Sequence, residues 1–238
     1  MARSLRHALR WFADRLFPPH CQACGDPGAN GLELCAPCTR SLPWHHDACP
    51  LCAAPLADDA GDLCFQCEEC PPALDACWAS LLYEDPIAGL LLRHKFHQDL
   101  AAGRLCAQLM QLNPPPWDVP VIAVIPLHRR RLCQRGYNQA AELARPMRLP
   151  QWHGLRRIRA TAPQSERDAD ARRHNLEGAF AVEGPVPPSV VLLDDVMTTG
   201  STLHMAAQAL RSAGCGDVRA WVCARVPQRR PDRVTGSR

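Results

Sequence analysis

The stretch Val190–Thr202, which reads VVLLDDVMTTGST, carries the pattern from which the fold of this chain can be worked out. Four aliphatic residues, Val190–Leu193, have the composition of a strand that is buried on both faces, as strands of parallel sheets are. Two adjacent carboxylates, Asp194 and Asp195, follow directly, and a run of hydroxyl side chains around one glycine comes next. An apolar run that ends in clustered polar residues predicts a binding site at the end of this strand.

The residues after the strand are suited to a phosphate group. In parallel α/β sheets, ligands gather beyond the carboxyl ends of the strands. The loop should enter the N-terminus of a helix, whose free backbone N–H groups and positive dipole end bind anions. Gly200 lets the backbone approach an anion closely, and the remaining loop residues are hydroxyl donors: Thr198, Thr199, Ser201 and Thr202. Two carboxylates suit vicinal hydroxyls, so carboxylates and loop together match the two ends of a ribose 5-phosphate.

Two other interpretations of this stretch were weighed. An ATPase Walker B strand also ends on two aspartates, but it requires a Gly-x-x-x-x-Gly-Lys-Ser/Thr loop elsewhere in the chain. Lys95 is the only lysine, and His94 rather than glycine precedes it, so the ATPase interpretation fails. An acidic strand end followed by an ordinary Thr/Ser helix cap, with no ligand, is the second alternative and stays open at this point.

The apolar segments elsewhere alternate between strand and helix patterns. This alternation predicts an α/β fold with a parallel sheet flanked by helices. Further strands are expected at residues 76–83, 119–127 and 217–226, with edge strands at 155–160 and 178–183. Helices are expected at 86–96, 100–112, 137–147 and 202–214, the last one ended by Gly214.

Cysteines concentrate near the N-terminus. Eight of them form four Cys-x-x-Cys pairs, separated by ten, ten and eleven residues. Each pair places two thiolates on one tight turn, and two pairs complete a tetrahedral site, so the four pairs predict two zinc ions. Four thiolates leave no open position for water, which makes the zinc structural. Pairing in sequence order closes the shortest loops and gives the sites Cys21, Cys24, Cys35 and Cys38, and Cys49, Cys52, Cys64 and Cys67.

Alternatives to these zinc sites were considered. Interleaved pairing of the four turns stays open. A disulfide framework needs an oxidising compartment, and the N-terminus does not have the pattern of an export signal. Four evenly spaced pairs also differ from the single motif of a thioredoxin-type redox site. Four cysteines outside this region are expected to be small buried apolar residues: Cys106, Cys133, Cys215 and Cys223.

Composition and length set the organisation of the chain. It has 238 residues, of which 47% are hydrophobic, so a packed core is expected; its net charge of +3 is too small for extensive coating of nucleic acid. No run of about 18 apolar residues occurs, so no membrane span is expected. Residues 1–18 predict an amphipathic helix that docks on its own protein or lies on a membrane surface. Residues 227–238 predict a basic disordered tail, and the expected compartment is the cytoplasm.

The stretch at 190–202 resembles the phosphoribosyl-pyrophosphate (PRPP) motif of type I phosphoribosyltransferases. The whole chain resembles the ComF family, whose members join an N-terminal double zinc ribbon to such a domain and are linked to natural competence. The resemblance rests on the four Cys-x-x-Cys pairs and on the segments at 91–96 (LLRHKF), 124–144, 155–180 and 190–203. It implies a double zinc ribbon at 19–70 and a phosphoribosyltransferase-like domain at 71–226.

The resemblance also implies roles for individual residues. Asp194 and Asp195 would bind the ribose hydroxyls of PRPP, and residues 198–202 would bind its 5-phosphate. The place of the pyrophosphate-binding loop is taken by His128, Arg129, Arg130 and Arg131. Mg²⁺ would accompany PRPP, as its preference for oxygen ligands suggests. A hood loop that closes over the reaction would include Arg157, Thr161, Gln164, Arg173 and Asn175.

The implied reaction is displacement of pyrophosphate from ribose C1 by an unknown acceptor, and no catalytic residue is assigned. Salvage enzymes of this class carry a base-binding segment beyond the last core strand, where this chain has only a short basic tail. The zinc ribbons are one candidate to supply the acceptor pocket. The alternative function is a non-catalytic adaptor that uses the PRPP fold, or a competence factor that binds single-stranded DNA or competence proteins. Aromatic residues make up only 5% of the chain, which disfavours base stacking.

Overall fold

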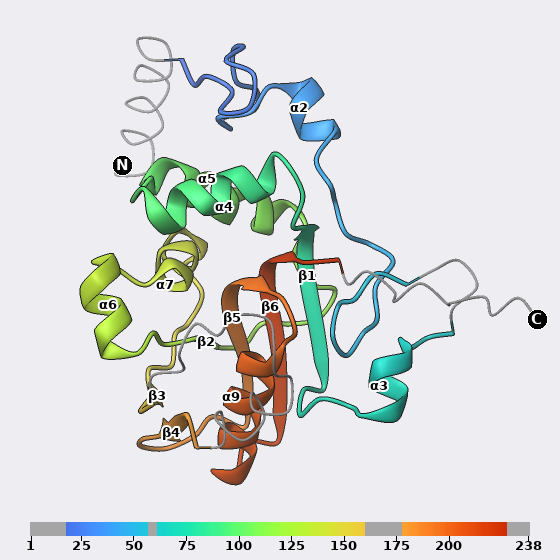
Figure 1. Cartoon of the computed structure of the whole chain (residues 1–238), viewed down its shortest axis with the longest axis vertical. Coiled ribbons are helices and arrows are strands. Elements are labelled where there is room, and N and C mark those ends of the chain that lie inside the picture. Colours follow the sequence, from blue (N-terminus) through green and yellow to red (C-terminus); the bar gives the residue numbers. More distant parts are fainter. Residues whose placement is uncertain (1–17, 57–60, 160–177, 228–238) are drawn as a thin grey trace, which may run out of the picture.

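A four-stranded parallel sheet forms the centre of the computed structural model, which describes residues 18–56, 61–159 and 178–227 (Figure 1). The strands are β1 (Ala76–Leu82), β2 (Ile122–Val124), β5 (Ser189–Met197) and β6 (Asp217–Arg225). Their order in the sheet is β1-β6-β5-β2, and each neighbouring pair is parallel. The carboxyl ends of the strands therefore share one edge of the sheet. This confirms the predicted α/β fold.

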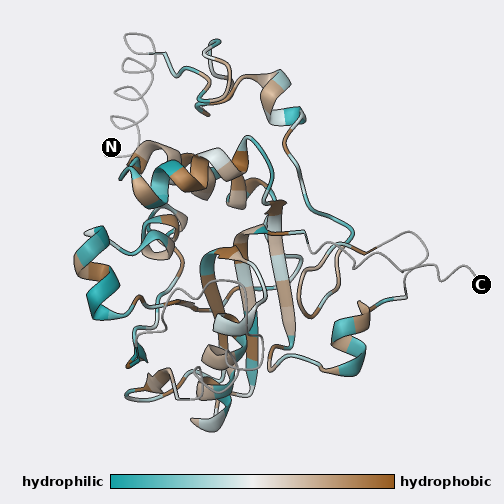
Figure 2. Ribbon diagram, viewed as in Figure 1, coloured by the Kyte–Doolittle hydropathy of each residue, from teal (hydrophilic) through white to brown (hydrophobic). Residues whose placement is uncertain are grey.

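Helices cover both faces of the sheet. Val191 and Leu193 of β5 belong to a core with the helices α4 (Ile87–Phe96), α5 (Leu100–Leu112) and α7 (Gln139–Ala144), and with the 3₁₀ helix η1 (Arg145–Met147). Val190 and Leu192 point to the other face and pack with α9 (Ser201–Ser212). All four side chains are fully buried. Burial on both faces explains why this strand is continuously apolar; Figure 2 shows the brown, hydrophobic strands between their helices.

The remaining elements differ from the predicted ones mainly in length. β2 has three residues instead of the nine expected, because Pro120 and Pro126 bracket it and proline donates no hydrogen bond to a neighbouring strand. The predicted edge strands form a separate antiparallel pair, β3 (Leu155–Arg157) and β4 (Phe180–Val182). Gly214, at φ +95°, ends α9 as expected.

The cysteine-rich segment, with the short helices α2 (Ala36–Arg40) and α3 (Phe65–Glu69), wraps around the edge of β1. The Leu82 N–H donates to the Pro43 carbonyl at 2.8 Å, and the Cys77 N–H donates to the Pro50 carbonyl at 2.7 Å. Trp44 and Leu81 form an antiparallel bridge between these two points. The outer edge of the sheet is thus paired by residues 43–50, which protects it from pairing with other chains.

The two halves of the cysteine-rich segment lie on opposite faces of the sheet. Cys21 and Cys35 are buried in the core that contains α4 and α5. Ala53 is buried in the core that contains α9, and Cys52 packs against that core. Figure 1 accordingly shows α2 above α4 and α5, and α3 beside the start of β1. The segment therefore clamps the sheet edge rather than extending away from the α/β core.

Three predictions fall wholly or largely outside the described residues. They are the N-terminal helix at 1–18, the tail at 227–238 and most of the hood loop, including Thr161, Gln164, Arg173 and Asn175. Within the ranges that the structure describes, no helix combines the length and the apolar character needed to cross a membrane. The boundaries at 19–70 and 71–226 stay a prediction.

Candidate functional site

The loop after β5 has the geometry of an anion-binding turn. Gly200 is the N-cap of α9, with φ +77° and ψ 0°, and a Cβ there would lie under 3.0 Å from the Met197 methyl. Glycine is the residue that adopts this conformation without strain. Gly200 has no side chain to cap α9, and the Ser201 N–H makes a long hydrogen bond of 3.5 Å to the Thr199 hydroxyl oxygen. N–H groups at a helix N-terminus of this kind can bind an anion. The hydroxyl oxygens of Thr199 and Ser201 lie 2.9 Å apart at the same place.

The two carboxylates are the sixth and seventh of the nine residues of β5, which continues to Met197 before the loop begins. Asp194 Oδ1 accepts a hydrogen bond from the Asp195 N–H at 2.9 Å, and Asp195 Oδ1 accepts one from the Val196 N–H at 2.8 Å. Burial raises the pKa of the Asp194 carboxyl, and the negative charge of Asp195 raises it further. A pair of acceptors held in this way suits two adjacent hydroxyl groups.

Basic side chains from three elements act electrostatically on Asp194 or on one another. The positive charge of Lys95 on α4 lowers the pKa of Asp194 and so offsets part of its rise. Burial lowers the pKa of the Arg157 guanidinium on β3, the charge of Arg131 lowers it further, and the charge of Asp194 opposes both. The Arg157 guanidinium also lies 5.5 Å from the ring centre of Phe180. Lys95 and Arg157 thus place positive charge near Asp194, and Arg131 adds positive charge near Arg157; these three residues are called the positive rim below.

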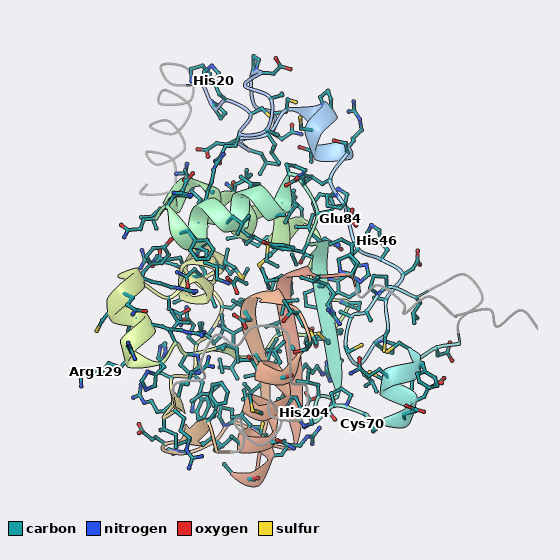
Figure 3. All side chains as sticks on the ribbon, in the orientation of Figure 1. His20, His46, Cys70, Glu84, Arg129 and His204 are labelled. Atoms are coloured by element: carbon teal, nitrogen blue, oxygen red, sulfur yellow. The ribbon has the colours of Figure 1, made fainter. Side chains whose placement is uncertain are left out.

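The residues expected to form the pyrophosphate-binding loop lie in a helix instead. α6 spans Arg129–Arg135, and His128 caps it by accepting a hydrogen bond from the Arg130 N–H at 3.3 Å. The helix forms because a capping residue and Gly136, at φ +80°, bracket seven residues without a helix breaker. The pyrophosphate-binding role of these residues stays a prediction. Arg129 and Arg130 are exposed, and Figure 3 shows Arg129 on the outer side of α6. Of these residues, Arg131 is the one whose charge acts on Arg157, where it lowers the pKa of the guanidinium.

Sequence reasoning missed three residues at this site. Lys95 stood out as the only lysine but received no role. Burial raises the pKa of the Tyr83 phenol, and the charge of Asp195 raises it further, so Tyr83 lies near the second carboxylate. Arg225 donates hydrogen bonds to the carbonyls of Met197 and Thr198 at the start of the loop. The available signal for Arg225 was an arginine that directly follows the apolar run at 220–224 at the end of β6.

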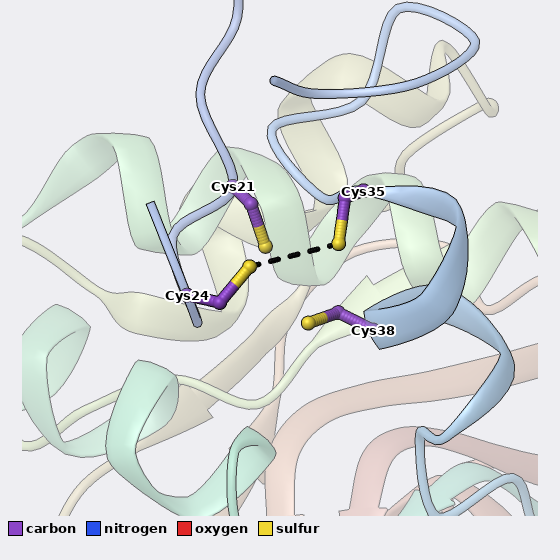
Figure 4. Close-up of side chains that lie close together, drawn as sticks. All are labelled: Cys21, Cys24, Cys35 and Cys38. Carbon is purple, nitrogen blue, oxygen red and sulfur yellow. Dashed lines mark hydrogen bonds between the residues drawn. The ribbon is translucent and has the colours of Figure 1, made fainter. Parts of the chain in front are cut away.

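The four Cys-x-x-Cys pairs form two compact clusters, in the sequential pairing that local loop closure favours. In each cluster the four sulfur atoms lie within 4.8 Å of one another. Figure 4 shows the first cluster, with its sulfur atoms turned toward a common centre. The Cys24 and Cys35 sulfurs are 3.6 Å apart, and the Cys52 and Cys64 sulfurs are 3.5 Å apart. Tetrahedral zinc with Zn–S bonds of about 2.3 Å requires sulfurs about 3.8 Å apart, so both clusters fit zinc.

The thiol groups show why a cation stabilises these clusters. At Cys21, burial opposes ionisation, but backbone N–H donors outweigh it and lower the pKa to about 6. The pKa of Cys49 is lowered in the same way. The pKa of Cys38 is raised to about 11, chiefly by its hydrogen bond with Cys35, and burial raises that of Cys52 to about 11. Each cluster thus accepts one negative charge readily, and a divalent cation removes the repulsion that resists the others.

The other cysteines also have defined positions. All fourteen cysteines lie within the described residues and are free thiols. Cys106, Cys215 and Cys223 are buried, as expected, but Cys133 is exposed. That prediction is wrong because α6 (RRRLCQR) is mostly charged and buries none of its residues.

Comparisons with known proteins agree with this geometry. Residues 12–68 match the family model "Double zinc ribbon domain", and residues 181–236 match "Phosphoribosyl transferase domain". The DNA utilization protein YhgH of Salmonella typhimurium is 34% identical over 224 residues, which cover 87% of this chain and 97% of that protein. Competence protein F of Haemophilus influenzae is 31% identical over 230 residues, which cover 87% and 95%. The chain belongs to the ComF family.

Membership of the ComF family confirms the predicted combination of a double zinc ribbon and a phosphoribosyltransferase domain. The first family model includes all eight paired cysteines, and the second includes the carboxylates and the loop at 198–202. A solved structure described as the allosteric regulatory enzyme of purine biosynthesis is 21% identical, covers 51% of this chain and 25% of its own, and has a TM-score of 0.34.

Proposed function

We propose that this ComF-family protein binds PRPP with Mg²⁺ at the end of β5 and transfers the phosphoribosyl group to an acceptor. One observation carries the proposal: a fixed carboxylate pair is followed, within one turn, by the glycine-capped and hydroxyl-rich N-terminus of α9. Asp194 and Asp195 hold the ribose hydroxyls. Residues 198–202 hold the 5-phosphate through hydroxyl groups and backbone N–H groups.

The positive rim supplies the residues that bind the pyrophosphate leaving group in this proposal. Arg131, with His128, Arg129 and Arg130 on the same segment, binds the diphosphate, for which guanidinium groups are well suited. The C1–O bond to pyrophosphate breaks, and the leaving group departs with the electron pair while the acceptor forms its bond to C1. Arg131 stabilises the charge that builds on the leaving oxygen, and Arg157 closes the site together with the rest of the hood loop. Bound Mg²⁺ supplies further charge neutralisation, and the Asp194 and Asp195 oxygens are ligands of the type that it prefers.

A second candidate function is a non-catalytic adaptor that binds PRPP or single-stranded DNA in the cytoplasm. Exposed Arg129 and Arg130 on α6 favour it, because guanidinium groups on a surface contact nucleic-acid phosphates. The relatives' names refer to DNA utilization and competence. Interaction with competence proteins belongs to the same proposal.

The deciding experiment measures pyrophosphate released from labelled PRPP, in the presence of Mg²⁺ and candidate acceptors. The double variant Asp194→Asn/Asp195→Asn serves as the control. Release that depends on an acceptor and is lost in the control supports transfer. Binding of PRPP without release supports the adaptor. A wild-type protein whose melting temperature does not respond to millimolar PRPP argues against both PRPP-based functions.

A further inference from the structure

The side chain of Arg225 connects the second cysteine cluster to the loop at 198–202. Arg225 ends β6 and is 1% exposed. Its Nε donates to the Cys52 carbonyl at 3.0 Å. Its Nη1 donates to the Met197 carbonyl at 3.2 Å and also to the Thr198 carbonyl. One buried guanidinium thus joins the backbone of a zinc-ligating residue to the backbone that opens the phosphate loop.

An arginine is well suited to this connection. A buried charge is costly unless its donors are satisfied, and the planar guanidinium carries five donors in a fixed fork. The acceptors named above, together with the Val226 carbonyl at 2.8 Å from Nη1, are all backbone atoms. Backbone acceptors cannot turn away by changing a rotamer. A displacement of the turn at Cys52 therefore either moves the loop with it or leaves a buried donor without its acceptor.

Other contacts show that the second cluster and the loop face each other. They form parts of the wall of one cavity of about 480 Å³, lined by Cys52 and Cys67 from the cluster and by Thr199, Gly200 and Ser201 from the loop. Cys70 and His204, which line the same cavity, lie on facing elements in Figure 3.

The first cluster lies elsewhere. Cys21 and Cys35 are buried against the helices α4 and α5, on the other face of the sheet. Beside them, Arg93 of α4 donates a hydrogen bond to the Gln22 side chain, and Arg104 of α5 forms an ion pair with Glu33. Arg225 therefore links the second cluster to the phosphate loop at 198–202, by hydrogen bonds to the Cys52 and Thr198 carbonyls.

We propose that Arg225 is a positioning residue through which the phosphate loop depends on the second zinc site and not on the first. The proposal rests on the PRPP-binding function proposed above. With zinc bound, the turn at Cys52 is rigid and holds Arg225, which in turn fixes the Met197 and Thr198 carbonyls. Without that zinc the turn is released, Arg225 loses an acceptor, and the N–H groups at the start of α9 lose their alignment toward the 5-phosphate.

A matched pair of cysteine variants tests the proposal. Cys35 and Cys64 are the N-caps of the five-residue helices α2 and α3, and each supplies one thiol to one cluster. Cys35→Ser and Cys64→Ser each remove one thiolate and keep a favourable N-cap residue. Both changes are made in the wild type and in Arg225→Met, and elemental analysis establishes the loss of one zinc. The measurements are PRPP affinity by calorimetry and amide hydrogen exchange of residues 198–202 without PRPP.

Cys64→Ser is expected to weaken PRPP binding about tenfold or more and to speed hydrogen exchange at 198–202. Cys35→Ser should leave both within about twofold. In the Arg225→Met background, Cys64→Ser should add almost nothing, because the connection is already broken. Equal effects of the two cysteine variants, or full additivity with Arg225→Met, would overturn the proposal.

Two further measurements cover the cases in which Arg225→Met does not fold or the wild type does not bind PRPP. If Arg225→Met does not fold, Arg225→Lys replaces it, because lysine keeps the charge but not the fork. Wild-type exchange rates and wild-type coupling in that variant would overturn the role of the guanidinium. If the wild type does not bind PRPP, the proposed function fails, and the exchange pattern across the variants alone decides whether the second site controls the loop.

Discussion

Replacing Gly200 by alanine tests the conformation of the loop and its ligand role together. Gly200 has φ +77°, a left-handed conformation that costs an L-residue about 1–2 kcal/mol. The added Cβ would overlap the Met197 methyl, which must leave its position at a cost of about 0.5–1.5 kcal/mol. The ligand-free variant should therefore lose about 1.5–3.5 kcal/mol of stability, which lowers the Tm of a chain of this size by roughly 3–14 °C.

Calorimetric melting with and without PRPP and Mg²⁺ separates the two roles. PRPP at about 100 times its Kd should stabilise the wild type by about 2.7 kcal/mol, and this gain should vanish in Gly200→Ala because Cβ keeps the phosphate from the backbone. The matched control is Gly214→Ala. Gly214 has φ +95°, but its Cβ would meet nothing within 4 Å, so this change costs backbone strain only and leaves the PRPP response intact.

Met197→Ala alone should destabilise the protein, because it truncates a buried side chain. In the Met197→Ala background, Gly200→Ala should cost less than it does in the wild type, because the overlap is removed. If the ligand-free variants Gly200→Ala and Gly214→Ala have the same Tm, the overlap with Met197 costs nothing. A PRPP response retained in Gly200→Ala would refute the assignment of this loop to the 5-phosphate.

Three further predictions concern the charged and metal-binding groups. Asp194→Asn should stabilise the ligand-free protein at neutral pH, because burial and Asp195 raise the pKa of Asp194 and so disfavour its folded carboxylate. The gain in unfolding free energy should be complete above the pKa of Asp194 in the folded protein, shrink as the pH falls and disappear below the pKa of about 3.9 in the unfolded chain. Urea unfolding across this pH range measures the gain, and a gain that does not change with pH contradicts the prediction. Replacing both Asp194 and Asp195 by Asn should weaken PRPP binding by about 1–3 kcal/mol, and unchanged calorimetric affinity in a folded double variant would reject the ribose assignment. Protein purified under reducing conditions should contain two zinc ions per chain, one for each cluster, and chelation should unfold the region at 21–67 as followed by limited proteolysis; elemental analysis without zinc would exclude this.

Sequence patterns predicted well those elements whose structure is determined by residues close together in the sequence. β5 is recognisable because burial on both faces demands an uninterrupted apolar run, and the loop because its turn requires glycine at a positive φ. The cysteine spacing predicted two four-thiol sites, and short loop closure favoured the sequential pairing that the structure shows. The helix α6 was not predicted, because this segment was interpreted from the family resemblance and not from its own start and stop residues, His128 and Gly136.

The residues that were missed depend on contacts between distant segments. Arg225 meets the Cys52 carbonyl across 173 positions in the sequence. The charge of Lys95 acts on Asp194 because α4 packs on the sheet. The pairing of residues 43–50 with β1 likewise requires the folded sheet, and the sequence of residues 43–50 shows no strand-like alternation that would predict it.

The long separation between Cys52 and Arg225 also orders events during synthesis. A ribosome makes the cysteine segment first and β1 soon afterwards, but β6, which lies between β1 and β5, is the last strand to emerge. The nascent chain therefore carries both complete thiol clusters long before it has a finished sheet, since folding proceeds from the N-terminus during translation. A chain that stops short of Arg225 keeps every zinc ligand but lacks the side chain that joins them to the loop. All eight paired thiols are therefore available to a metal ion before the strand that carries Arg225 is made.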